Sequence, residues 1–147
     1  MAEIKGIIER YESHDYRVLV DIWESAVKAT HDFLAEEDFL FFKDAIPNEY
    51  LPQLEVYVFR AEAILGFMAV NEQHLEMLFV HDAVRGCGVG KQLLGYAVEV
   101  LGVNSVDVNE QNEQAVAFYQ KQGFKIASRT EMDSLGKDYP VLLLVID

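Results

Sequence analysis

The stretch VHDAVRGCGVGK at residues 80–91 lies between a predicted strand and the start of a predicted helix. Its glycines let the main chain come close to a ligand, because no Cβ stands in the way. The first turn of a helix offers unpaired N–H groups and a partial positive charge, and Arg85 and Lys91 add full charges beside it. The stretch therefore predicts an anion-binding loop at a helix N-terminus.

Two common phosphate-binding loops do not fit this stretch. A Walker A loop needs glycine five residues before its Gly-Lys pair and Ser or Thr after it, but the sequence has Arg85 and Gln92 there. The dinucleotide pattern G-x-G-x-x-G needs a glycine where the sequence has Lys91. The pattern that remains is R-x-x-G-x-G, formed by Arg85, Gly88 and Gly90.

The spacing of apolar residues predicts both helices and strands around this loop. Apolar residues three and four apart predict helices, whereas β-branched and aromatic segments joined by very short polar connections predict antiparallel hairpins. Asp32 is the expected N-cap of the second helix, Pro47 is expected to interrupt it, and Gly123 is expected to end the last helix. The order of elements indicates a mixed α/β fold. The expected elements are a strand at 4–8, helices from near 13–15 to 27 and from 32 to 47, strands at 55–60, 63–71 and 74–80, a helix at 88–100, a strand at 105–108, a helix at 113–121, and strands at 124–130 and 141–147.

Length and composition fit one globular domain that spans residues 1–147. Of the 147 residues, 51% are hydrophobic, which is enough for a core without disulfides. Cys87 is the single cysteine, so neither an intrachain disulfide nor a cysteine-rich zinc site can form. The four histidines include no pair at metal-ligand spacing on one element, and we therefore expect no metal site.

Charge and hydropathy limit the expected partners. The formal net charge is −13 at pH 7, and a surface of this sign repels phosphate backbones and attracts amines and basic peptides. We therefore expect no nucleic-acid partner. Residues 1–5 do not resemble a signal peptide, and no apolar run reaches the roughly 18 residues of a membrane helix. These features predict a cytoplasmic protein without a membrane partner.

Two motifs together resemble those of the GNAT superfamily of acetyl-CoA-dependent N-acetyltransferases. The first is the R-x-x-G-x-G pattern, which resembles the family's pyrophosphate loop. The second, NEQAVAFY at residues 112–119 followed by Gly123 and Phe124, is similar to the family signature N-x-x-A-x-x-F-Y-x-x-x-G-F. The resemblance implies the GNAT fold, a mostly antiparallel sheet of six to seven strands that is splayed between the fourth and fifth strands and carries four helices.

The resemblance also implies an acetyl-CoA site. The main chain of Phe79 and Val80 would pair with the pantetheine arm like an added strand, and Asn112 and Ala115 would contact the far side of that arm. Direct acetyl transfer needs no acyl-cysteine, so the cysteine in the loop is not expected to be catalytic. The loop residues whose amides would hold the pyrophosphate are Arg85, Gly86, Cys87, Gly88, Val89, Gly90 and Lys91.

Attack of an amine on a thioester needs a neutral amine, a stabilised oxyanion and a proton donor for the leaving thiolate. The family pattern places Tyr119 beside the sulfur, and a phenol is protonated at neutral pH; the alternative is a tyrosine that only packs in the core. The N–H of Leu78 is a weaker candidate for the oxyanion donor.

Two carboxylates are candidates for the general base, and transfer without a dedicated base is the third possibility. Alternation along residues 74–80 predicts that Glu76 lies on the face opposite Leu75, Met77 and Phe79. Asp107 lies on a short strand that we place centrally, where a carboxylate is costly unless it is hydrogen-bonded or functional.

The acceptor site is expected near His31 and Phe33, at the junction of the first two helices, and near Tyr139 in the last hairpin.

The expected activity is transfer of an acetyl group to a primary amine, of a small molecule or of a protein, by direct attack in a ternary complex. The alternative is a non-catalytic CoA-binding sensor that acts through a protein partner. A homodimer through exposed strand edges is also considered. The aromatic residues in and near the second helix, expected mostly in the core, are Phe33, Phe39, Phe41, Phe42 and Tyr50.

Overall fold

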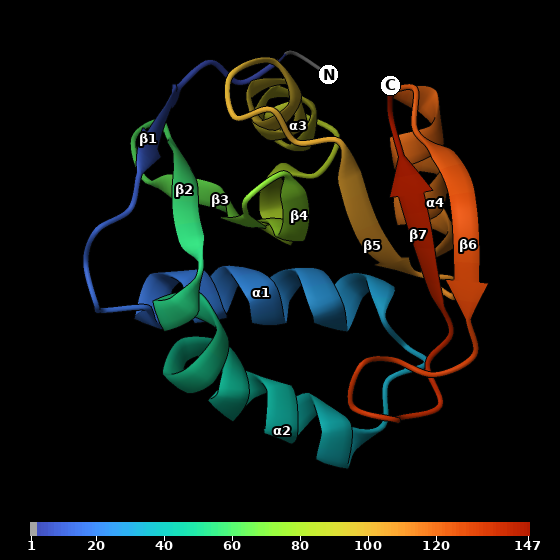
Figure 1. The fold of residues 1–147 in the computed structure, drawn as a ribbon. Helices are drawn as coiled ribbons and strands as arrows, with labels where there is room; N and C mark the ends of the chain where they lie inside the picture. Colours follow the sequence, from blue (N-terminus) through green and yellow to red (C-terminus); the bar gives the residue numbers. More distant parts are fainter. Residues whose placement is uncertain (1–2) are drawn as a thin grey trace.

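The computed structural model describes residues 3–147 (Figure 1). Residues 1 and 2, part of the expected domain and of the segment inspected for a signal peptide, lie outside the described residues. The strands are β1 (Ile7–Arg10), β2 (Glu55–Arg60), β3 (Ile64–Asn71), β4 (His74–Val80), β5 (Ser105–Asn109), β6 (Lys125–Thr130) and β7 (Val141–Val145). The helices are α1 (Arg17–Thr30), α2 (Glu36–Ala45), α3 (Val89–Glu99) and α4 (Glu113–Lys121), with short helical turns η1 (Ile46–Tyr50), η2 (Leu51–Gln53) and η3 (Asp82–Val84). In this part of the chain, no helix is long and apolar enough to cross a membrane.

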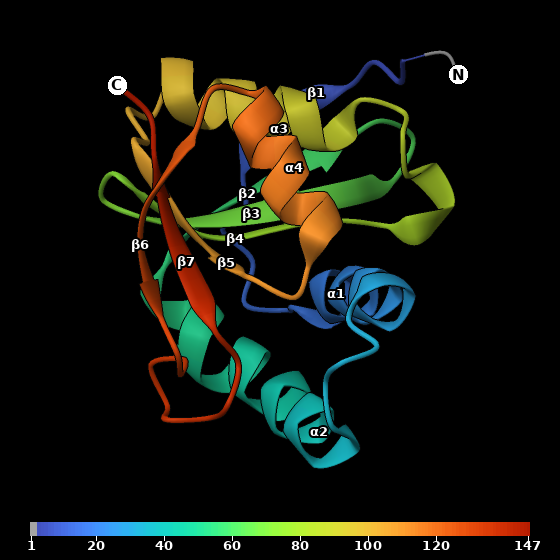
Figure 2. The same cartoon turned by 90° about the vertical axis from the view of Figure 1, so that its right-hand side faces the viewer.

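The seven strands form one sheet in the order β1-β2-β3-β4-β5-β7-β6, with helices on both faces (Figures 1 and 2). Every pairing is antiparallel except that of β4 with β5. Side chains alternate along β3 between two cores: Met68 and Val70 pack with α3, and Phe67 and Ala69 pack with α1. The mixed α/β fold expected from the sequence is confirmed.

The sheet opens between β4 and β5. These strands share only the pairs His74↔Ser105 and Leu75↔Val106. On its other side β4 carries a bulge at Glu76, because Leu75 pairs with Val70 while Met77 pairs with Ala69. An extra residue of this kind bends a strand and interrupts its alternation. The splay expected between the fourth and fifth strands is therefore present.

The bulge corrects one expectation about β4. Strict alternation predicted that Leu75, Met77 and Phe79 share one face, opposite Glu76. In the structure Leu75 belongs to the core under α3, whereas Met77 and Phe79 pack against the core under α1. The extra residue at Glu76 moves the following side chains to the other face.

The boundaries of the first two helices also differ from expectation. α1 begins at Arg17, and the Asp15 carboxylate, near the expected start, binds the Arg17 guanidinium at 2.6 Å. α2 begins after Ala35 rather than at Asp32, and no side chain caps it. The α-helix ends at Ala45, just before Pro47, as expected, and the chain continues through the separate helical turn η1.

Two of the second-helix aromatics are placed differently from expectation. Phe33 precedes α2, and Phe41 is 42% exposed on it. Phe39, Phe42 and Tyr50 pack against the core under α1, as expected for most of this set.

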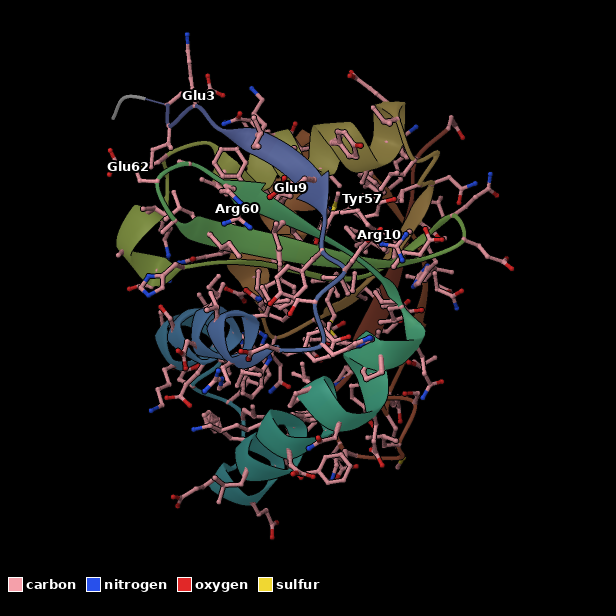
Figure 3. The ribbon with its side chains drawn as sticks, turned by 90° about the vertical axis from the view of Figure 1, so that its left-hand side faces the viewer. Glu3, Glu9, Arg10, Tyr57, Arg60 and Glu62 are labelled. Atoms are coloured by element: carbon pink, nitrogen blue, oxygen red, sulfur yellow. The ribbon has the colours of Figure 1, made fainter. Side chains whose placement is uncertain are left out.

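The β1 edge of the sheet carries charged side chains. Arg60 Nε donates to Glu9 Oε1 at 2.6 Å, and the Arg10 guanidinium lies 5.7 Å from the centre of the Tyr57 ring (Figure 3). Charged side chains on an edge strand discourage pairing with another sheet. The opposite edge, β6, is exposed along its whole length, and a homodimer through a strand edge stays a prediction.

Candidate active site

A cavity of about 330 Å³ lies where β4 and β5 part, on the face covered by α3 and α4. It brings together β4, the glycine loop and the start of α4. Two residues of the expected cofactor set do not border it: Phe79 faces the other side of the sheet, and the main chain of Cys87 is bonded to the N-terminal segment. The expected residues that line it are Val80, Arg85, Gly86, Gly88, Val89, Gly90, Lys91, Asn112 and Ala115, and Leu78 and Tyr119 line it as well.

The glycine loop has the backbone shape that only glycine adopts readily. Gly86 and Gly88 have φ values of +79° and +84°, and Gly88 is the N-cap of α3. Within the described part of the chain, no side chain caps α3, and its first turn holds no acidic residue. The first N–H groups of α3 therefore stay available to an anion beside the cavity. These features fit a pyrophosphate group.

The N-terminal segment supports the glycine loop from outside the cavity. Ile4 N donates to the Cys87 carbonyl at 2.9 Å, and Gln92 Nε2 donates to the Ile4 carbonyl at 2.7 Å. The Glu3 side chain lies against Gly88, where a Cβ would come within 2.8 Å of Glu3 Cγ. Sequence patterns did not suggest this contact, because it joins residues far apart in the chain.

Tyr119 sits on α4 with its ring beside the cavity. Asn112 Oδ1 accepts a hydrogen bond from Ala115 N at 3.2 Å, which caps α4 and fixes its start. The Tyr119 ring makes edge contacts with Phe118 and Phe124, and the residue is 6% exposed. Burial raises the pKa of Tyr119 above its ordinary value, so the phenol stays protonated at neutral pH.

Both carboxylates named as candidate bases meet at the start of β4 and β5, together with His74. Atoms of His74, Glu76 and Asp107 lie within 4.8 Å of one another. His74 Nε2 donates to Asp107 Oδ2 at 3.1 Å, and its Nδ1 is hydrogen-bonded to Ser105 Oγ at 2.7 Å. This hydrogen bond to Asp107 raises the pKa of His74, against the effect of burial. Among residues 3–147, Glu76 has no hydrogen-bond or ion-pair partner.

Sequence reasoning missed His74. Metal-ligand spacing was sought along single elements, whereas this cluster forms across two strands. Its three groups are of types that ligate divalent cations. Ligand atoms around one such ion lie about 3 Å apart, so the cluster would have to contract to hold a metal.

On the other face of the sheet, two adjoining cavities lie between β4 and the helices α1 and α2. The first, of about 190 Å³, is lined by His31, Trp23 and Phe79, among others. Burial lowers the pKa of His31 to about 4. The second, of about 500 Å³, is called the acidic groove below. It is lined by Phe42, Glu49, Tyr50, Gln53, Leu54, Glu76, Met77, Asn109, Asp133, Ser134 and Leu135.

A clasp holds the loop between β6 and β7 against the start of α2. Tyr139 Oη donates to Asp38 Oδ2 at 2.5 Å and accepts from Ala35 N at 3.1 Å. Lys137 Nζ donates to Asp38 Oδ1 at 2.8 Å, and the Phe33 ring lies 6.1 Å from the Tyr139 ring. Phe33 and Tyr139, expected at the acceptor site, thus contact each other in the clasp, and Asp38 and Lys137 were not foreseen.

The fold, the glycine loop and the α4 signature together define a GNAT-type acetyltransferase. Residues 24–134 match the family described as Acetyltransferase (GNAT) domain. The chain belongs to this family, and it is an N-acetyltransferase.

Individual relatives agree with this assignment. The chain is 44% identical over 139 residues to the peptidyl-lysine N-acetyltransferase YjaB of Escherichia coli K12, covering 93% of this chain and 94% of the relative. The solution structure of apo-form YjaB from Escherichia coli superposes with a TM-score of 0.88 at 41% identity, over 97% of each chain. The PaiA N-acetyltransferase of Thermoplasma acidophilum, solved in complex with coenzyme A, has the same fold, with a TM-score of 0.74 at 18% identity over 95% of this chain and 98% of that one.

His74 and His31 are expected to titrate on opposite sides of 6.5, their usual pKa. Asp107 raises the pKa of His74, whereas burial lowers that of His31 to about 4. Asp107→Asn removes the carboxylate, so the pKa of His74 should fall while that of His31 stays. NMR titration of the imidazole C–H resonances measures both. An unchanged His74 pKa in the variant contradicts the ion pair.

The pKa shifts of His74 and His31 determine how these two residues make stability depend on pH. Because the pKa of His74 is raised on folding, its contribution is present below pH 6.5 and is lost as the pH rises through the folded pKa. The depressed pKa of His31 acts in the opposite sense, so stability is lost as the pH falls from 6.5 toward about 4. In urea unfolding, wild type and Asp107→Asn should therefore differ more below pH 6.5 than at alkaline pH.

Proposed function

We propose that this chain transfers the acetyl group of acetyl-CoA to the ε-amine of lysine side chains in proteins, as one catalytic domain spanning residues 1–147. The observation that carries the proposal is that the glycine loop and Tyr119 border one cavity at the opening between β4 and β5. Lysine as acceptor is supported by relatives such as YjaB, a peptidyl-lysine N-acetyltransferase at 44% identity. Membership of the family gives no support to a non-catalytic sensor.

The chain offers separate contacts to two parts of acetyl-CoA, which supplies the activated thioester. The glycine loop and the first turn of α3 would hold the pyrophosphate, as their φ values and free helix end suggest. Past Leu75, the side of β4 that faces β5 has no strand partner. The main chain of Phe79 and Val80 would therefore pair with the extended pantetheine arm.

Tyr119 is proposed as the acid that protonates the leaving thiolate. Its ring borders the cavity, and its raised pKa keeps the phenol protonated at neutral pH, so that a proton is present for the leaving thiolate. A purely structural role for Tyr119 is the alternative, because the ring also packs against Phe118 and Phe124.

Glu76 is proposed as the general base for the amine. Its side chain borders the acidic groove and has no partner among the described residues, whereas the Asp107 carboxylate already accepts from His74. Glu76 is therefore the carboxylate more available to an amine. Direct attack in a ternary complex is proposed as well, and cavities on both faces of the sheet beside β4 support it, because each could hold one of the two substrates.

Gly90→Glu is expected to weaken acetyl-CoA binding at least tenfold, a change of about 1.4 kcal/mol. A Cβ at Gly90 would meet Val80 and Phe118 at 3.6 and 3.7 Å, ordinary contacts that direct a longer side chain into the cavity, where a carboxylate repels pyrophosphate. Isothermal titration calorimetry measures the affinity. Gly95→Glu, with open space at its Cβ on the same helix, is the charge-matched control. Equal losses in both variants would remove the loop from the proposed site.

Tyr119→Phe is expected to lower kcat by about 10²- to 10⁴-fold, the usual range for loss of a general acid, while binding of acetyl-CoA stays near wild type. Acetylation of a lysine peptide, followed by mass spectrometry, measures the rate. Tyr96→Phe is the control, because Tyr96 of α3 packs against Tyr57 of β2 and does not line the cavity. A fully active Tyr119→Phe enzyme would leave only the structural role.

Glu76→Gln is expected to lower kcat/KM for a lysine peptide at neutral pH more than Asp107→Asn does. The deficit should shrink as the pH approaches the lysine pKa of about 10.4, because an amine that is already neutral needs no base. Steady-state rates over a pH series measure this. The reverse order of the two variants would assign the base to Asp107, and near-normal rates in both would mean transfer without a dedicated base.

A further inference from the structure

The acidic groove carries carboxylates from three different parts of the chain. Glu49 comes from η1, Glu76 from β4 and Asp133 from the loop between β6 and β7. Of the described residues that line the groove, none is Lys or Arg. The groove is therefore a surface on which negative charge is concentrated without a cation in its wall.

Neighbouring cations compensate these carboxylates only in part: His74 acts on Glu76 and Lys137 acts on Asp133 through their charges. Across residues 3–147, neither the Glu49 nor the Glu76 side chain takes part in an ion pair. Asp133 Oδ1 accepts from the N–H groups of Leu135 and Lys137, at 2.9 Å each, which fixes the loop and leaves Oδ2 toward solvent or a ligand. Lys137 Nζ, the ammonium on the same loop, is held by Asp38 at 2.8 Å.

Two of these carboxylates, Glu49 and Asp133, act through their charges on one residue of the groove, Tyr50. The pKa of the Tyr50 phenol is raised first by burial and then by Glu49 and Asp133, while Lys137 acts in the opposite sense. Both carboxylates therefore act on the same residue of the wall. A cation placed there would interact with both.

Apolar side chains also line the groove, which lies on the opposite face of β4 from the proposed cofactor cavity. Leu54, Leu135 and Met77 line the groove, and Met77 directly precedes Leu78, which borders the cavity on the other face. An alkyl side chain suits such a wall, as the methylene stem of lysine does. At about 500 Å³ the groove has the size of a site that holds more than one side chain.

We propose that the acidic groove selects target lysines that lie within basic segments, with Glu49 and Asp133 binding Lys or Arg residues that flank the acetylated lysine. The inference rests on the proposed lysine acetylation. Charge complementarity supports it, because an acidic wall that holds no Lys or Arg favours a cationic peptide and disfavours an acidic one. The formal net charge of −13 attracts cationic peptides at long range, but it does not select which residues flank the target lysine.

The test compares two peptides that differ only in the residues flanking one lysine, Arg in the first and Gln in the second. Two partly exposed ion pairs predict that the wild type prefers the Arg peptide by about two- to twentyfold in kcat/KM. In the double variant Glu49→Gln with Asp133→Asn, the ratio should fall toward one. Asparagine keeps an Oδ1 for the N–H groups of Leu135 and Lys137, so the loop retains its shape.

Glu62→Gln is the control for net charge. Glu62 is exposed at the turn between β2 and β3, away from α2 and the groove (Figure 3). This variant changes the net charge as each groove substitution does, and it should keep the wild-type preference for the Arg peptide. An equal loss of preference in Glu62→Gln would overturn the assignment to the groove.

Two further outcomes separate this inference from the function on which it rests. Equal kcat/KM values for both peptides in an active wild-type enzyme would overturn the selection of basic segments and leave lysine acetylation intact. Absence of acetylation on both peptides, with acetyl-CoA bound, would overturn the proposed lysine activity and the inference with it.

Discussion

Two residue pairs join β4 to β5, and the arrangement of the site depends on the two strands separating after the second pair. The bulge at Glu76 bends β4 just after Leu75, so the strands part while each stays anchored in its own half of the sheet. The opening exposes one side of the β4 main chain, and the glycine loop and α4 meet beside it. A fully paired β4–β5 ladder would leave the β4 main chain no free hydrogen-bonding groups to offer a ligand.

Local patterns predicted what local forces determine. The limits of β2, β4 and α4 agree with the expected ranges, because hydrophobic period, short turns and the Asn112 cap act within a few residues. The bulge was missed, since an inserted residue is defined only relative to the neighbouring strand. The end of the second helix near Pro47 was predicted, since proline disrupts an α-helix, but the helical turns η1 and η2 that follow were not.

The part of the candidate site that carries sequence motifs, the glycine loop and α4, was predictable. The part formed by contacts between distant segments was much less so. Gly88, Gly90 and Tyr119 lie in segments whose sequence signatures resemble those of a family, and the structure brings them to one cavity. His74 and the Asp38 clasp come from residues without a signature, joined by contacts between distant segments. Charge alone indicated a cationic partner, but only the fold shows that Glu49 and Asp133 gather on one wall.

The clasp also affects the order in which the site is assembled. Lys137 lies 99 residues after Asp38, and Tyr139 lies 101 residues after it. Contacts of such long sequence separation close late, because the loop entropy must be lost before they stabilise the chain. The loop that carries Asp133 is therefore seated only when almost the whole sequence is available. On a nascent chain, the wall of the acidic groove that contains Asp133 can therefore form only after the C-terminal hairpin has been synthesised.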